Sequence, residues 1–174
     1  MTDFPLIHPE LEALLTPVAY APGSPNLAVR SQLQQIANEL PAKAKNRGFG
    51  LACVAGLWLY HDFLDESHSI SQDLDTAEGS YWHALMHRRE GDYSNAKYWF
   101  RCVGEHAIFP ALAVVVREFG LKLKSEHWNP FDFVDLCEKH TGTGTPDEML
   151  LRRVQQKEWE LLFDWCYQRA FGID

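Results

Sequence analysis

Residues 76–103 read TAEGSYWHALMHRREGDYSNAKYWFRCV, and this stretch predicts two helices joined by a tight turn. We expect the first helix over residues 76–90 and the second over residues 93–103. Gly91 and Asp92 interrupt the pattern between them. Asp92 is a good N-cap for the second helix, because a carboxylate accepts hydrogen bonds from the unpaired N–H groups of the first turn. A helical hairpin in the middle of the chain is typical of an all-α protein.

The residues before the hairpin predict further helical segments. The expected elements are a short helix at 9–15, a loop at 16–25, a helix at 30–40, a polar connector at 42–48 and a long helix at about 50–70. Pro41 is expected to end the helix at 30–40, because proline cannot donate a helical hydrogen bond. In the long helix, apolar residues recur with a period near 3.6, so that Val54, Leu57 and Leu64 share one face.

The residues after the hairpin carry start signals for three more helices. Pro110 lies in the first turn of a helix that ends near Gly120. Asn129 and Pro130 open a helix that reaches about residue 140. The last helix is expected over residues 146–171, where a capping box precedes it. With no convincing strand, the sequence predicts one helical domain over residues 1–174, an irregular all-α bundle of about six to eight helices with a loop-rich N-terminal arm at residues 1–25.

The composition narrows the classes of function. The chain has 174 residues, of which 46% are hydrophobic, so it can form a packed core. Its formal net charge of -8 argues against nucleic acid as a partner and against binding to an anionic membrane surface. The longest apolar run, residues 107–116, is too short to cross a bilayer, and no secretory signal is seen at the start, so a cytoplasmic location is expected. The four cysteines, which form no CxxC pair, are interpreted as reduced core thiols; they are Cys53, Cys102, Cys137 and Cys166.

The hairpin also resembles a known repeat. Small, turn and aromatic residues fall where a tetratricopeptide repeat has them: Ala84, Gly91, Asp92, Tyr93, Ala96 and Phe100. Residues 77–110 are therefore similar to a single tetratricopeptide-like hairpin, although no second copy follows 34 residues later. Residues 65–68 and 81–92 also resemble an uncharacterised all-helical family. These resemblances imply a helical fold, with close packing at Ala84 and Ala96, and no activity.

Two helices carry histidines and carboxylates at the same spacing. On the first, the residues at positions i, i+4 and i+7 are His61, Asp65 and His68, which an ideal helix places within an arc of roughly 60°. On the second, the triplet with that spacing is His83, His87 and Glu90. Both triplets are expected to face inward, and the three charged residues on the other side of the second helix, Glu78, Arg88 and Arg89, are expected to face water. Because the helices are consecutive, antiparallel packing would bring all four histidines together.

Three interpretations of this cluster remain open. Neutral imidazoles with carboxylates suit a divalent metal such as Zn, Fe, Mn or Ni, and facing helices of a bundle commonly supply such ligands. The same side chains could instead form a structural network in which every buried polar group has a partner. A third possibility is metal-free catalysis or ligand binding, with a carboxylate-oriented histidine as general base.

Several weaker signals accompany the cluster. Arg88, Trp99 and Arg101 are candidates for contacts with a small ligand, by ion pairing or by stacking. The segment Gly142-x-Gly144 before a helix is interpreted as a linker and not as a phosphate loop, and the Cys102–His106 spacing is weak support for a thiolate pair. The sequence thus favours a helical domain with an inward site for a metal ion or small ligand. The alternative is a non-catalytic module that binds a protein partner through the hairpin surface.

Overall fold

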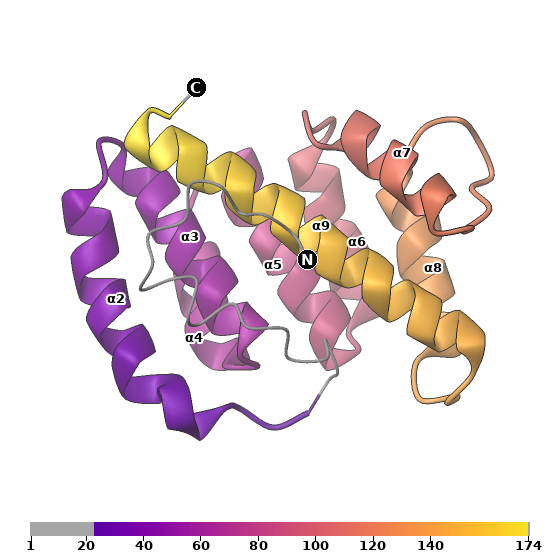
Figure 1. The fold of residues 1–174 in the computed structure, drawn as a ribbon, viewed down its shortest axis with the longest axis horizontal. Coiled ribbons are helices and arrows are strands. Elements are labelled where there is room, and N and C mark those ends of the chain that lie inside the picture. Colours follow the sequence, from indigo (N-terminus) through magenta and orange to yellow (C-terminus); the bar gives the residue numbers. More distant parts are fainter. Residues whose placement is uncertain (1–22, 174) are drawn as a thin grey trace.

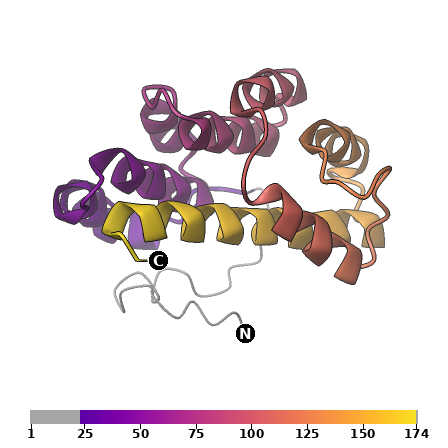
Figure 2. The ribbon, with the colours of Figure 1, turned by 90° about the horizontal axis from the view of Figure 1, so that it is seen from above.

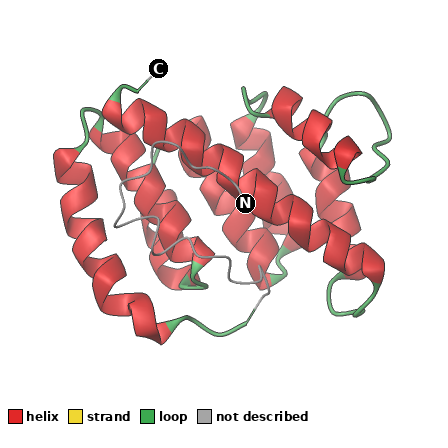
Figure 3. Ribbon diagram, viewed as in Figure 1, coloured by secondary structure: helices red, strands yellow, loops and turns green. Residues whose placement is uncertain are grey.

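The computed structural model describes residues 23–173 and confirms the all-α class. Within these residues it contains eight α-helices, one short 3-10 helix and no strand (Figure 3). The elements are η1 (Leu27–Val29), α2 (Arg30–Lys43), α3 (Arg47–Tyr60), α4 (Leu64–Ser71), α5 (Ala77–Glu90), α6 (Tyr93–Val103), α7 (Phe109–Glu118), α8 (Pro130–His140) and α9 (Pro146–Phe171). The helix expected at residues 9–15 lies outside the described residues. Within the described part, no helix is long and apolar enough to cross a membrane.

The long helix α9 organises the bundle. It packs against α3, α7 and α8, and it runs across the other helices in Figure 1. Turned by 90°, Figure 2 shows α9 along one side of the molecule and the segment around residues 77–103 on the other. Helix α5, which belongs to that segment, contacts α3, α4 and α6, and all of its residues from Gly79 to Arg88 are buried. Every side of α5 therefore meets another part of the chain.

The hairpin predicted from residues 76–103 is present. Thr76 caps α5 by accepting a hydrogen bond from the Gly79 N–H at 3.0 Å, and Asp92 caps α6 in the same way from the Asn95 N–H at 3.0 Å. Gly91 takes a φ of 90°, a left-handed conformation that glycine adopts without steric cost. The similarity of this hairpin to a tetratricopeptide repeat stays a prediction.

The expected long helix at 50–70 is wrong, because the chain breaks between α3 and α4. Asp62 adopts a φ of 67°, which ends the helical path. Its carboxylate accepts hydrogen bonds from the Arg89 Nε at 2.9 Å and from the Gly23 N–H at 2.7 Å. These long-range contacts hold Asp62 in a left-handed conformation that aspartate tolerates better than most residues. No glycine or proline marks the break, so the sequence pattern continues through it.

Two smaller expectations are also corrected. Helix α2 continues through Pro41 to Lys43, and α3 begins already at Arg47 because Asn46 caps it, accepting hydrogen bonds from the Gly48 and Phe49 N–H groups. All four cysteines are free thiols, but Cys102 is exposed on α6 and is not a core residue.

A close approach of α3 to α5 and α9 builds the centre of the core. The Trp159 indole N–H donates a hydrogen bond to the Gly56 carbonyl oxygen at 2.8 Å. A Cβ atom on Gly56 would lie only 2.8 Å from ring carbons of Trp82, which is buried. The missing side chain of Gly56 therefore lets the Trp82 ring lie directly against the α3 backbone.

We predict that Gly56→Ala destabilises the fold by about 1–3 kcal/mol, through overpacking against Trp82. Alanine is intrinsically better than glycine inside a helix by up to about 1 kcal/mol, so the loss would run against helix propensity. The matched control is Gly48→Ala in the first turn of the same helix, where a Cβ meets only the Asn46 side-chain oxygen at 3.4 Å. Urea unfolding of both variants tests this, and a Gly56→Ala protein as stable as the control would contradict it.

Candidate functional site

The structure gathers three of the four predicted histidines. His68 on α4 and His83 and His87 on α5 each offer a ring nitrogen, and these nitrogens all lie within 4.8 Å of one another. The His68 ring meets the His83 ring edge-on at 4.6 Å between centroids and the His87 ring at 5.5 Å. His83 and His87 are one turn apart on α5 and stack at 4.7 Å. We call His68, His83 and His87 the histidine cluster.

His61 and Asp65 do not join the histidine cluster, contrary to expectation. The break at Asp62 separates His61 from α4, and the buried His61 ring packs against Tyr60 at 5.1 Å. Asp65 lies in the first turn of α4 and is exposed. The assignment of His61 assumed one continuous helix from 50 to 70, so it fails for the same reason as that helix. Asp65 shares α4 with His68, but its side chain is exposed and lies outside the cluster.

His83 is the most enclosed member of the cluster. Only 2% of its surface is exposed, and its ring stacks on Trp99 of α6 at 3.9 Å with 17° between the planes. Its Nδ1 has no hydrogen-bond partner among the described residues. Burial, followed by the nearby His87 and His68, lowers the pKa of His83 to about 4. His83 is therefore a neutral imidazole with an available nitrogen lone pair at neutral pH.

Glu90 takes an orienting position beside the cluster. Its carboxylate oxygen lies 2.6 Å from Nδ1 of His87. With the proton on Nδ1 donated to Glu90, the Nε2 lone pair of His87 is left for another ligand. A carboxylate oxygen of Asp92 lies within 4.8 Å of the ligand atoms of His87 and Glu90. The Asp92 oxygens already accept hydrogen bonds from Asn95 and Ser94. The arrangement matches the carboxylate–histidine pairs that fix the tautomer of metal-binding histidines.

The other ligand candidates are scattered over α5 and α6. Trp99 covers one side of His83, as described above. Arg101 is exposed on α6, and Arg88 is buried on α5. Cys102 and His106 are not neighbours on one helix, because α6 ends at Val103, between the two residues.

The opposite side of α5, which was expected to face water, holds a buried polar network. Arg88 donates a hydrogen bond to one carboxylate oxygen of Glu158 on α9, and the Tyr81 hydroxyl donates to the other at 2.9 Å. The side chains of Arg88 and Glu158 are 1% and 0% exposed. Arg89 donates a hydrogen bond to Asp62, and the Glu78 carboxylate accepts one from the indole N–H of Trp165 at 3.0 Å. The sequence did contain one sign of this network. Glu158 stands among the apolar positions of α9, and a glutamate in such a position indicates a buried partner of opposite charge.

The Gly142-x-Gly144 segment binds an anion from its own chain. The Glu148 carboxylate accepts hydrogen bonds from the Gly142 and Gly144 N–H groups at 3.0 and 2.7 Å. These N–H groups, followed by Arg152, lower the pKa of Glu148 to about 2. The predicted capping box is thus present in altered form, because Thr145 accepts from the Glu148 N–H at 3.4 Å while the glutamate turns back to the two glycines.

Comparisons of the chain with protein-family models, with curated proteins and with solved structures found no match. The function of the chain is therefore inferred from its own geometry. The feature of the described residues on which that inference is built is the histidine cluster beside α4.

We predict that the metal-free protein loses stability as pH falls from about 6.5 to about 4, in part through His83. In this window the unfolded state binds a proton on His83 and the folded state does not, so the free energy of unfolding decreases with falling pH. A pKa shift of this size corresponds to about 3 kcal/mol at most. His83→Gln should flatten this part of the profile when unfolding is measured with chelator present. An equal flattening in His127→Gln, at an exposed histidine, would contradict the assignment.

We predict that Glu158→Leu costs about 3–5 kcal/mol, because it removes the carboxylate partner of a buried arginine. It also removes the acceptor of the Tyr81 hydroxyl. The double variant Arg88→Met/Glu158→Leu should recover a large part of the loss, because apolar side chains of similar size can replace a buried ion pair. Denaturant unfolding of the three proteins gives the coupling energy, and a purely additive result would show that the pair does not act as a unit.

Proposed function

We propose that the histidine cluster binds one divalent transition-metal ion, and that the chain is a metal-binding helical domain. The observation that carries the proposal is the buried His83 Nδ1, which has no hydrogen-bond partner among the described residues, beside two further imidazoles. In a purely structural network, most buried polar nitrogens of this kind are paired. A metal ion supplies the missing partner without a proton.

The geometry is compatible with such an ion after small adjustments. Metal–nitrogen bonds of 2.0–2.1 Å in a tetrahedral site place ligand nitrogens about 3.3 Å apart. The nitrogens of the histidine cluster lie within 4.8 Å of one another, so rotations of the side chains close the remaining distance. His68 is half-buried and has the most room to move, whereas Trp99 holds the His83 ring in place.

The donor set favours particular metals. Three neutral imidazoles suit Zn, Ni or Fe better than Mn, which binds more weakly to nitrogen ligands. Three protein ligands also leave a coordination position for water or a small ligand, as in catalytic zinc sites. Glu90 supports the site by holding the His87 ring in place.

The proposal predicts stoichiometric binding of zinc to chelator-treated, untagged protein in isothermal titration calorimetry. His83→Ala and His68→Ala should abolish that binding or weaken it sharply, because each removes a ligand. Glu90→Gln should weaken it by about 10–100-fold, because it acts only through His87. Binding should weaken as pH falls, because protons compete for the imidazoles.

The matched control is His127→Ala, which removes an exposed histidine outside the cluster. It should bind zinc as tightly as the unchanged protein. If chelator-treated protein bound none of Zn, Ni, Fe or Mn, or if His83→Ala bound as well as the control, the structural-network interpretation would replace the proposal. Protein interaction through the hairpin surface stays a separate prediction.

A further inference from the structure

A pocket with an apolar lining lies between helix α8 and the loop that leads into it from α7, on the right of Figure 1. Its volume is about 180 Å³. The apolar side chains are those of Leu123 in the loop and of Phe133 and Leu136, which are one turn apart on α8. A cavity of roughly 150 Å³ can hold a benzene ring, so this pocket has room for one small ring.

The loop that forms one wall of the pocket is anchored at both ends. After α7, the Leu121 N–H donates a hydrogen bond to the Val116 carbonyl oxygen at 3.0 Å, and before α8 the Asn129 side chain caps the first turn. The Trp128 side chain is buried, and its ring centroid lies 4.8 Å from that of Phe133. Because the wall is in place before a ligand binds, little conformational entropy is lost on binding.

Charged side chains surround the apolar lining, and the positive charges are in excess. The lining contains three lysines and two aspartates: Lys122, Lys124, Lys139, Asp132 and Asp135. Asp132 pairs with Lys124 at 2.6 Å, and Asp135 pairs with Lys97 of α6. Lys122 and Lys139 are exposed, and their ammonium groups have no ion-pair partner among residues 23–173. Two positive charges beside the pocket therefore lack a counter-charge from the described part of the chain.

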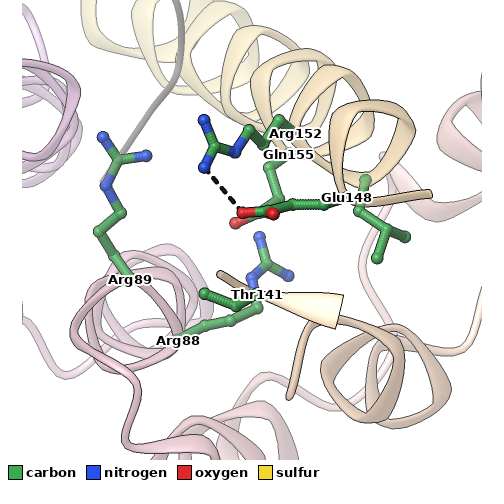
Figure 4. Close-up of a pocket in the computed structure, with 7 residues that line it drawn as sticks. Arg88, Arg89, Thr141, Glu148, Arg152 and Gln155 are labelled. Atoms are coloured by element: carbon green, nitrogen blue, oxygen red, sulfur yellow. Dashed lines mark hydrogen bonds and ion pairs between the residues drawn. The ribbon is translucent and has the colours of Figure 1, made fainter. Parts of the chain in front are cut away.

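The smaller pocket between α5 and α9, drawn in Figure 4, shows what paired charges look like in this protein. Each of its arginines pairs with a carboxylate of the chain: Arg88 with Glu158, Arg89 with Asp62 and Arg152 with Glu148. Its volume is about 20 Å³, which leaves room for about one water molecule. The arginines in Figure 4 therefore serve the packing of the protein, whereas the two lysines beside α8 are available to a ligand.

We propose that the pocket beside α8 binds a small carboxylic acid with one aromatic ring. The ring lies against Leu123, Phe133 and Leu136, where its burial removes apolar surface from water and places it next to another aromatic ring. The carboxylate lies at the mouth of the pocket beside Lys122 and Lys139. Since these lysines are exposed, the carboxylate stays partly hydrated and avoids the cost of burying an ion.

The test is a nuclear magnetic resonance titration of the ¹⁵N-labelled protein with sodium benzoate at constant low ionic strength. We expect saturable binding in the millimolar range or tighter, with the largest shifts at the backbone amides of residues 121–139. Acetate carries the charge without the ring, and benzyl alcohol carries the ring without the charge, so both should bind more weakly than benzoate. Benzylammonium, with the opposite charge, should bind most weakly of the ring compounds.

The double variant Lys122→Gln/Lys139→Gln should weaken benzoate binding about three- to tenfold, as expected for two exposed ion pairs, and leave benzyl alcohol binding unchanged. Both side chains are exposed, so the variant is expected to fold, which its amide spectrum verifies. The matched control is Lys43→Gln/Lys45→Gln, which removes the same charge between α2 and α3 and outside the pocket. It should bind benzoate as the unchanged protein does.

Four outcomes would overturn the proposal. The first is the absence of saturable benzoate binding below about 20 mM. The second is equal weakening in the two double variants, which would show a nonspecific effect of net charge. The third is binding of acetate or benzylammonium as tight as that of benzoate, because the apolar lining or the lysines would then not take part. The fourth is a set of shifts centred outside residues 121–139.

Discussion

The buried ion pair between Arg88 and Glu158 ties the central helix α5 to the long helix α9, and the position of the histidine cluster depends on it. Glu158 receives Arg88 on one oxygen and Tyr81 on the other. Because Tyr81 and Arg88 are two turns apart on the same side of α5, these two contacts fix the rotation of the helix about its axis. With that rotation fixed, His83 and His87 lie roughly 120–160° away and meet α4 and α6.

Helix α5 therefore has no side that faces water along most of its length. Trp82 packs on α3 at Gly56, His83 on Trp99 of α6, and Arg89 on Asp62 at the break before α4. A helix surrounded on all sides would ordinarily be apolar all round. Here the helix buries three polar side chains, those of Arg88, Arg89 and His83. Burying such a side chain is costly unless its charge is paired or the group is neutral. Arg88 and Arg89 are paired with carboxylates, and burial keeps His83 neutral by lowering its pKa to about 4.

Neighbouring residues of α5 differ in their surroundings because they point to different sides of the helix. His87 is a member of the histidine cluster and Glu90 lies beside it, whereas Arg88 and Arg89 pair with Glu158 and Asp62. The neutral imidazoles and the paired guanidinium groups are therefore buried within a few residues of each other on different sides of one helix.

From α5 onward, the local structure followed from the sequence alone. Caps at Asp92, Asn129 and Thr145, together with the apolar period, placed α5 to α9 with correct boundaries, because capping is a short-range interaction between neighbouring residues. The i, i+4 pair His83 and His87 was assigned to one side of α5 for the same reason. What only the tertiary structure decided was the break at Asp62, the exclusion of His61 and Asp65 from the histidine cluster, and the burial of Arg88. The break at Asp62 and the burial of Arg88 depend on partners 27 and 70 residues away along the chain, Arg89 for Asp62 and Glu158 for Arg88. A periodic pattern describes only one helix at a time, so it cannot show which charged side chain will find a distant counter-charge and be buried with it.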